Sequence, residues 1–187
     1  MDERSRCGWA TSAPEYVAYH DDEWGRPLHG VTAMFERLSL EGFQSGLSWL
    51  VILRKRPAFR AAFAGFDPEL VARFGERDVQ RLLADAGIVR HRGKIEATLA
   101  NARATLALHE GGTPLHELVW DYRRDGPAPT AWLAQTPESV ELSKRLRKAG
   151  FRFVGPTTVY AAMQACGIVN DHLATCFVRD AVERDRS

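Results

Sequence analysis

The chain has 187 residues, of which 45% are hydrophobic and 26% are charged, the balance of an ordinary globular protein with one domain. It contains no apolar run near the roughly 20 residues that span a bilayer, and its first residues, MDERSRCGW, are too polar for a signal peptide. Its three cysteines have unrelated spacings. These features exclude membrane, collagen-like, disordered and small disulfide-rich secreted proteins. We expect a cytoplasmic monomer with reduced thiols and no protein partner.

The net charge is +1, from 25 Lys and Arg against 24 Asp and Glu, which argues against an indiscriminate polyanion binder. Basic residues nevertheless gather in short blocks at 54–56, 90–94 and 144–148. Phosphate binding depends on such local clusters rather than on total charge. The composition therefore permits nucleic-acid binding without requiring it.

Helical signals follow one another along the chain. A capping-box pattern at Ser12–Glu15 predicts a short helix, and apolar residues then recur at helical spacing from Met34 to a helix end expected at Gly42. A hydrophobic stretch covers 47–59. Residue pairs typical of helix starts follow at Asp67-Pro68 and Thr136-Pro137. Alternation of the kind that predicts strands is confined to a few residues, so the sequence predicts an all-α fold.

One helix pair stands out between residues 78 and 108. The pattern predicts a helix over 78–84, a glycine-containing turn at 85–89 and a second helix from about 92 to 108. Basic residues at the start of the second helix, with its free N–H groups and positive dipole end, favour an anion such as a phosphate. A solvated corner between two helices is the more common meaning of such a hairpin.

Two pairs of metal-ligand residues lie near opposite ends of the chain. Cys7 and His20 have twelve residues between them, and His172 and Cys176 stand four apart, which would place them on one face if that segment is helical. Two thiolates and two imidazoles suit tetrahedral zinc, and four protein ligands would make the site structural. On spacing alone, ordinary thiols and histidines are the more common interpretation of these pairs.

A single carboxylate stands among apolar and aromatic residues. Glu41 lies in the segment LSLEGFQSGLSW, where burial of an unpaired acid is costly. Five aromatic side chains are concentrated in the first 49 residues, at Trp9, Tyr16, Tyr19, Trp24 and Trp49. Rings with one carboxylate suit a flat cation, because the rings stack on it and their faces attract its charge. A solvated helix end for the acid and plain core packing for the rings are the alternatives.

Taken together, these segments resemble the DNA-3-methyladenine glycosylase I family of bacterial alkylation-repair enzymes. The resemblance covers nearly the whole chain and rests on motifs in the same order: CGW at 7–9, YVAYHDDEWG at 16–25, LEGFQSGLSW at 40–49, ADAGIVRHRGKI at 84–95 and GFRFVGPTTVYAAMQACGIVNDH at 150–172. Departures are minor, namely Ser45 where alanine is expected and a short tail after Cys176.

The resemblance implies a two-lobed helix-hairpin-helix glycosylase fold in a single domain, 1–187. Both termini would form one lobe, and a central lobe of about 50–130 would contain the hairpin at 78–108. The family's structural zinc ligands fall on Cys7, His20, His172 and Cys176. Its base-recognition acid falls on Glu41, and its pocket aromatics on Tyr16, Tyr19 and Trp49, with Trp9 and Trp24 nearby. Its DNA-contacting residues fall on Gly46, Leu47, Gly87, Arg90, Arg92, Gly93 and Lys94.

The implied activity is hydrolysis of the N-glycosidic bond of 3-methyladenine in double-stranded DNA. The nucleotide must first leave the stack, and a damaged base lowers that cost. Glu41 is the best candidate for a catalytic role, and nothing in the sequence marks a Schiff-base lysine for strand cleavage. A non-catalytic, zinc-stapled helical DNA-binding module is the alternative. A zinc hydrolase fits less well, because it requires an open metal position.

Overall fold

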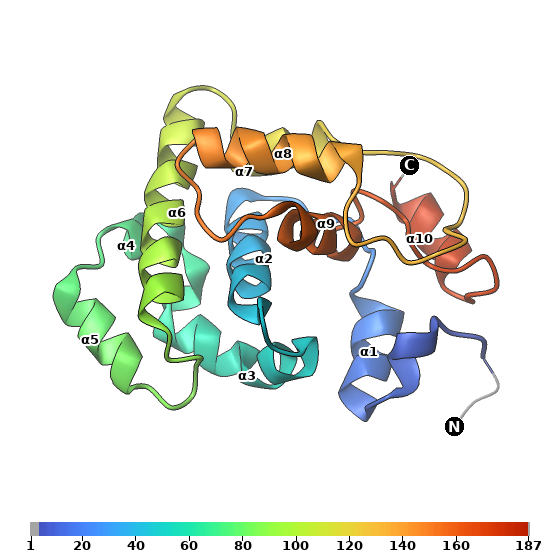
Figure 1. Ribbon diagram of the computed structural model, residues 1–187, viewed down its shortest axis with the longest axis horizontal. Helices are drawn as coiled ribbons and strands as arrows, with labels where there is room; N and C mark the ends of the chain where they lie inside the picture. Colours follow the sequence, from blue (N-terminus) through green and yellow to red (C-terminus); the bar gives the residue numbers. More distant parts are fainter. Residues whose placement is uncertain (1–3, 187) are drawn as a thin grey trace.

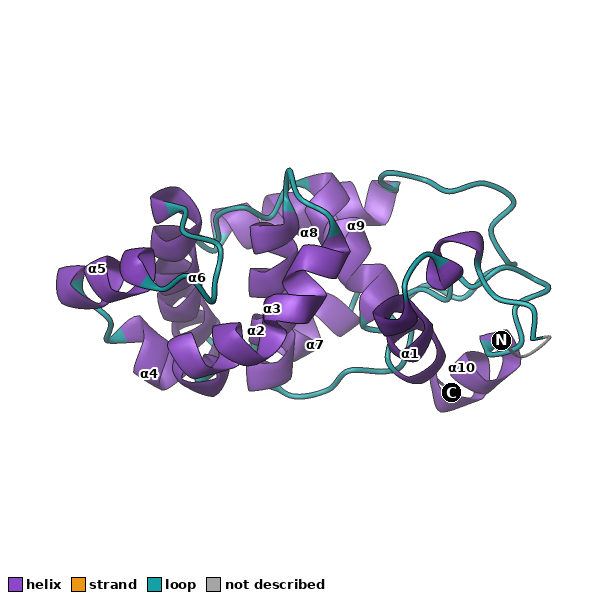
Figure 2. Ribbon diagram, turned by 90° about the horizontal axis from the view of Figure 1, so that it is seen from below, coloured by secondary structure: helices purple, strands orange, loops and turns teal. Residues whose placement is uncertain are grey.

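The structure, a computed structural model, describes residues 4–186, and every regular element in that range is helical (Figures 1 and 2). The predicted all-α fold is therefore confirmed. The helices in chain order are η1 (Gly8–Thr11), α1 (Pro14–Asp22), α2 (Val31–Gln44), α3 (Trp49–Ala62), η2 (Ala64–Phe66), α4 (Pro68–Ala72), α5 (Glu76–Ala84), α6 (Arg92–Glu110), α7 (Leu115–Trp120), α8 (Pro137–Lys148), α9 (Pro156–Ala165) and α10 (Arg179–Arg186). None of the helices between residues 4 and 186 has the length and apolar character of a bilayer crossing.

Two of the predicted helix starts form as their sequences indicate. The carboxylate of Asp67 accepts hydrogen bonds from the first backbone N–H groups of α4. At α8, the hydroxyl of Thr136 accepts from the N–H of Ser139, whose own hydroxyl accepts from the N–H of Thr136. In both helices a proline occupies the first turn, where its missing N–H is not needed.

Two local predictions are wrong. Ser12 does not cap α1; its hydroxyl donates to the carbonyl of Trp9 at 2.9 Å, and the helix begins at Pro14 without a side-chain cap. Gly42 does not end α2, which continues to Gln44. A Cβ at Gly42 would lie 3.4 Å from the Cβ of Phe153, so this glycine allows close packing inside a helix instead of a turn.

The hairpin of α5 and α6 forms close to its predicted bounds. The N–H of Gly87 donates to the carboxylate of Asp85 at 2.7 Å, which closes the turn. Lys55 on α3 donates to the carbonyls of Ala86 and Gly87. A Cβ at Gly87 would lie 3.0 Å from the side chain of Ala58. The turn is therefore held tightly against α3.

Helix α2 occupies the centre of the molecule and packs against α3, α6, α7 and α9. Its apolar side chains enter the main core, which extends over residues 34–169. A second, smaller cluster joins the two ends of the chain and contains Cys7, Tyr19, Trp24, Ala165, Cys176 and Val178. Figure 1 shows α1 and α10 on the same side of the molecule, although they are far apart in sequence. The site described next lies where this terminal cluster meets α2.

Candidate active site and metal centre

A cavity of about 580 Å³ lies between α1, α2, the start of α3 and α9. The structure brings together in its wall the acid and all five aromatic residues that the sequence singled out. The lining residues are Trp9, Ser12, Tyr16, Tyr19, Trp24, Glu41, Gln44, Trp49, Trp132, Leu133, Ala161 and Gln164. The sequence analysis missed Trp132, which comes from the loop before α8; the apolar pair Trp132-Leu133 in a loop between helices was the available signal.

The aromatic wall is built around η1 and α1. Because Tyr16 and Tyr19 stand three residues apart on α1, both rings face the same side of the helix. The ring of Trp9 meets Tyr16 edge-on at 5.6 Å and Trp24 edge-on at 5.2 Å. The hydroxyl of Tyr16 accepts a hydrogen bond from the N–H of Leu50 at 2.9 Å, which ties this wall to α3. The rings are therefore held by contacts that do not depend on a ligand.

Glu41 is the acidic group of the cavity. Its side chain comes from α2 and is only 5% exposed, and no described residue forms a hydrogen bond to its carboxylate. Burial raises the pKa of Glu41 to about 7, while Arg37, 3.9 Å away, acts in the opposite direction. A buried carboxylate that accepts no hydrogen bond and lies in an aromatic cavity favours a ligand that carries positive charge or hydrogen-bond donors.

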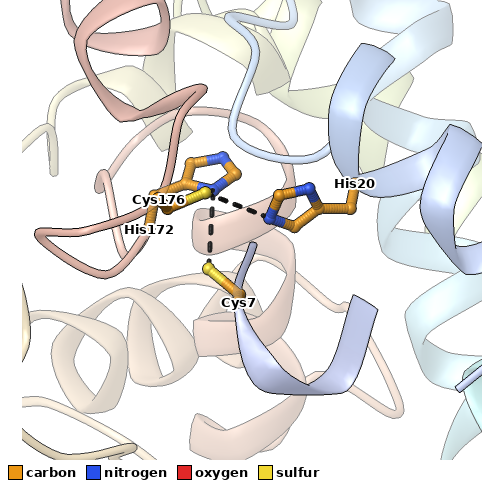
Figure 3. Close-up of side chains that lie close together, drawn as sticks. All are labelled: Cys7, His20, His172 and Cys176. Carbon is orange, nitrogen blue, oxygen red and sulfur yellow. Dashed lines mark hydrogen bonds between the residues drawn. The ribbon is translucent and has the colours of Figure 1, made fainter. Parts of the chain in front are cut away.

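The four predicted metal ligands converge although their chain segments are distant (Figure 3). One ligand atom from each of Cys7, His20, His172 and Cys176 lies within 4.8 Å of the others, and all four side chains are buried. The sulfur of Cys176 lies 3.4 Å from both His20 Nε2 and His172 Nδ1. The segment 172–176 is a loop between α9 and α10, so the condition for a shared helix face is not met. The loop, rather than helical spacing, turns both side chains inward.

The outer nitrogens of both histidines are held by the protein. His20 Nδ1 is 2.8 Å from the carboxylate of Asp21, and His172 Nε2 is 3.0 Å from the carbonyl of Trp24. Each ring therefore directs its other nitrogen into the cluster, the arrangement that supports histidine ligands in metal sites. Burial raises the pKa of Cys7 to about 12, so a thiolate there needs a cation beside it. The donor set can hold a metal ion.

The predicted DNA-contacting residues fall into two groups. Gly46 and Leu47 are exposed in the loop between α2 and α3, and Arg90 is exposed at the hairpin turn. Gly87 and Gly93 are partly buried beside that turn. Gly46 and Leu47 thus belong to the loop 45–48 before α3, Gly87 and Arg90 belong to the loop 85–91, and Gly93 lies in the first turn of α6.

Two cations of the hairpin are already engaged with protein groups. Arg92 forms ion pairs with Glu76 and Glu96 on the surface. Lys94 is only 7% exposed, and its ammonium donates to the carbonyls of Phe43 and Ser45. The side chain of Lys94 is therefore directed into the protein, where it holds the end of α2.

Comparison with known sequences places these features in a family. The sequence profile described as methyladenine glycosylase matches residues 9–179, which is most of the chain. The chain belongs to the methyladenine glycosylase family.

Two curated relatives match this methyladenine glycosylase family member over nearly their full lengths, which supports the family assignment. DNA-3-methyladenine glycosylase 1 of Escherichia coli (strain K12) is 49% identical over 177 residues, which cover 91% of this chain and 95% of that protein. DNA-3-methyladenine glycosylase of Haemophilus influenzae is 40% identical over 178 residues, 92% of this chain and 96% of that protein.

Solved structures of the family are similar as well. A crystal structure of 3-methyladenine DNA glycosylase I superimposes with a TM-score of 0.88 at 47% identity and covers 92% of this chain and 98% of that one. A structure of 3-methyladenine DNA glycosylase I from Staphylococcus aureus, which concerns 3-methyladenine recognition, has a TM-score of 0.86 and 35% identity. It covers 93% of this chain and 96% of that one.

Proposed function

We propose that this protein is a monofunctional DNA glycosylase that hydrolyses the N-glycosidic bond of 3-methyladenine in alkylated double-stranded DNA. The products are the free base and an abasic site. The observation that carries the proposal is the buried carboxylate of Glu41, which has no hydrogen-bond partner among the described residues and lies in a cavity walled by aromatic rings. The similarity to enzymes named for this activity supports it.

The cavity chemistry matches a methylated adenine better than an unmodified one. Methylation at N3 makes the base of the nucleotide cationic, and hydrogen bonds between ionised groups are roughly twice as strong as neutral ones. Trp49 would stack on the ring, and Glu41 would accept hydrogen bonds from its edge with help from a tyrosine hydroxyl. Unmodified adenine would lose the charge-assisted part of this recognition.

Recognition of the cation does not by itself accelerate the reaction. Bond cleavage discharges the base, so an interaction with its positive charge stabilises the ground state as well as the transition state. The alkylated bond is intrinsically weak and demands less of the protein. We therefore assign the enzyme three contributions, namely extrusion of the nucleotide, alignment of the base, and placement of water beside the sugar, with Glu41 as the catalytic residue.

The proposed reaction stops at the abasic site. A lyase needs a neutral lysine that attacks the sugar carbon, and the structure offers Lys94 no such freedom, because its ammonium is held by the carbonyls of Phe43 and Ser45. Lys55 is likewise bound to the carbonyls of the hairpin turn. Strand cleavage is not expected.

We propose that duplex DNA lies across the two exposed loops, 45–48 and 85–91. The turn between α5 and α6 would act as a helix-hairpin-helix, with its backbone N–H groups and Arg90 on a phosphate. Leu47 would enter the space that the extruded nucleotide leaves. In this arrangement the lobe formed by both termini carries the aromatic wall, and the central helices hold the DNA backbone.

We propose zinc as the metal of the terminal cluster. Zinc bonds of about 2.3 Å to sulfur and about 2.0 Å to nitrogen place tetrahedral ligand atoms about 3.5 Å apart. Three of the four sulfur–nitrogen distances, which are 3.4 to 3.7 Å, agree with that geometry. Four protein ligands leave no position for water, so the zinc would hold Cys7 and His20 against the loop at 172–176 and take no part in the reaction.

The test is chromatography of bases released from methylated duplex DNA. We expect 3-methyladenine from the wild-type protein and a reduction of at least about 100-fold in Glu41→Gln, as for loss of a general acid–base group. Glu36→Gln is the matched control, because Glu36 lies on the same helix but pairs with Arg60 at the surface. DNA binding without release of any base would instead support a non-catalytic DNA-binding module.

A further inference from the structure

An arginine is buried directly behind the cavity. Arg37 lies on α2, one helical turn before Glu41, and is only 8% exposed. It is absent from the residues that line the cavity. A guanidinium keeps its charge in proteins and is costly to bury without partners, so a buried arginine needs groups around it that stabilise its charge.

The partners of Arg37 are the cavity residues themselves. Its Nη1 donates a hydrogen bond to the hydroxyl of Tyr19 at 3.0 Å and lies 3.9 Å from Oε1 of Glu41. Its Cζ lies 5.5 Å from the ring centre of Tyr19 and 5.2 Å from that of Trp49, within the range of cation–π attraction. One side chain thus contacts the acid and two of the aromatic residues from behind.

We infer that Arg37 is a positioning residue whose fixed charge favours the ionised form of the Glu41 carboxylate in the ligand-free cavity. The two rings and the tyrosine hydroxyl anchor the guanidinium at a distance where it attracts the carboxylate without forming a hydrogen bond to it. The oxygens of Glu41 therefore stay available to a ligand. The consequence for base recognition rests on the proposed function; the ionisation of Glu41 does not.

Two effects act in opposite directions on the pKa of Glu41. Burial disfavours the charged form of Glu41 and raises its pKa to about 7, and Arg37 is the neighbouring charge that counteracts this. An opposite charge at this distance lowers a carboxyl pKa by about 1–3 units. Without Arg37, the acid would be mostly protonated at neutral pH and could not attract a cation.

The other titratable groups near this part of α2 do not replace Arg37. On α3, Arg56 is paired with Glu23 of the loop after α1. On α6, Lys94 donates to two carbonyls. The thiol of Cys166, which follows α9, has its pKa raised to about 12 by burial and stays neutral.

The inference is tested by titrating Glu41 directly. Carbon-13 NMR of carboxyl-labelled glutamate in the ligand-free protein, with the Glu41 signal assigned by its loss in Glu41→Gln, gives the pKa of this one group. In Arg37→Met, which keeps a long side chain without the charge, we expect the pKa to rise by about 1 unit or more. In Arg37→Lys, which restores a cation, we expect a value near that of the wild type. Arg60→Met, which removes an exposed arginine paired with Glu36, is the control and leaves the Glu41 pKa unchanged.

Base release supplies the second readout. The acid limb of kcat/KM for 3-methyladenine release should move to higher pH in Arg37→Met by the same amount as the Glu41 pKa, because this profile reports the free enzyme. At pH 7 a shift from about 7 to about 8 lowers the ionised fraction about fivefold. Well above the pKa the variant should match or exceed the wild type, since a repelling cation has been removed.

The outcomes separate the inference from the proposed function. A Glu41 pKa that is unchanged in Arg37→Met, or that rises equally in Arg37→Lys, overturns the inference whatever the rates show. If the wild-type protein releases no base, the proposed function fails, and the NMR titration still decides the role of Arg37. Thermal unfolding of each variant verifies that it is folded at the temperature of the titration.

Discussion

The ammonium of Lys94, on α6, donates a hydrogen bond of 2.5 Å to the carbonyl of Ser45, just beyond the end of α2. A second bond to the carbonyl of Phe43 makes this lysine a link between the hairpin and the loop at 45–48. The carbonyls at a helix C-terminus carry partial negative charge, so a buried cation is stabilised there. The two loops proposed to contact DNA are thus joined through one side chain.

Lys94→Met should therefore act on stability and loop order rather than on phosphate binding. We expect a loss of about 1–3 kcal/mol in the free energy of unfolding, because two carbonyls lose a charged donor. The salt dependence of duplex binding should stay as in the wild type.

The matched control is Arg90→Ala, at the exposed end of the same turn. Removal of a phosphate contact lowers the slope of log Kd against log salt by about 1. Urea unfolding and salt-dependent binding to an abasic-site duplex measure the two effects. A reduced slope in Lys94→Met would show that this lysine reaches DNA after all.

Glu41→Gln should stabilise the protein, and more so at alkaline pH. The folded-state pKa of Glu41, about 7, lies above its ordinary value of 4.5, so the folded protein retains a proton that the unfolded chain releases. This contribution to stability is present at low pH and is lost as pH rises through about 7. Glutamine mimics the protonated acid at every pH.

The stability gain of Glu41→Gln over the wild type should consequently grow by about 2 kcal/mol between pH 5 and pH 8. Urea unfolding at these two values checks the prediction, with Glu36→Gln as the surface control. A gain that is equal at both pH values would mean that the buried carboxyl does not titrate in this range.

Cys7→Ala should abolish metal binding and lower the thermal unfolding temperature. Three remaining ligands hold the ion less well, and both ends of the chain lose their cross-link. Cys166→Ala is the control, because Cys166 is also a buried free cysteine but lies beside Met34 and outside the ligand cluster. Elemental analysis should find one zinc per chain in the wild type and in Cys166→Ala. Undiminished zinc in Cys7→Ala would refute the four-ligand site.

Leu47→Ala should slow base release from duplex DNA without altering the fold. Leu47 is 40% exposed in the loop before α3, and in the proposed DNA contact its apolar side chain would fill the gap that the extruded nucleotide leaves. Leu70→Ala, at an equally exposed leucine on α4, is the control. Single-turnover release from methylated duplex is the measurement. Equal rates in the two variants would remove Leu47 from the proposed DNA contact.

The sequence predicted those features that depend on local pattern. The hairpin followed from its glycine turn and its flanking helices. One acid among aromatic residues suggested a cavity, and motif resemblance decided for it over core packing and a solvated helix end. Residue type and spacing suggested the four metal ligands, and motif resemblance decided for them over ordinary thiols and histidines. The loop conformation at 172–176 did not follow from a four-residue spacing that also fits a helix.

The remaining differences arise from tertiary contacts that no local pattern encodes. A glycine such as Gly42 often ends a helix, and only the close approach of Phe153 explains why this one lies inside α2. Lys94 has the sequence context of a surface cation, yet the end of α2 lies within reach of its ammonium. The sequence did not predict a role for Arg37, because that role depends on contacts with rings from α1 and α3.

Trp24 belongs to the cavity wall by its ring and to the ligand cluster by its carbonyl, which faces His172. A disturbance of either site therefore reaches the other through this one residue. A substitution at His172 would shift the backbone that carries the Trp24 ring, so the shape of the cavity depends on a side chain that does not line it.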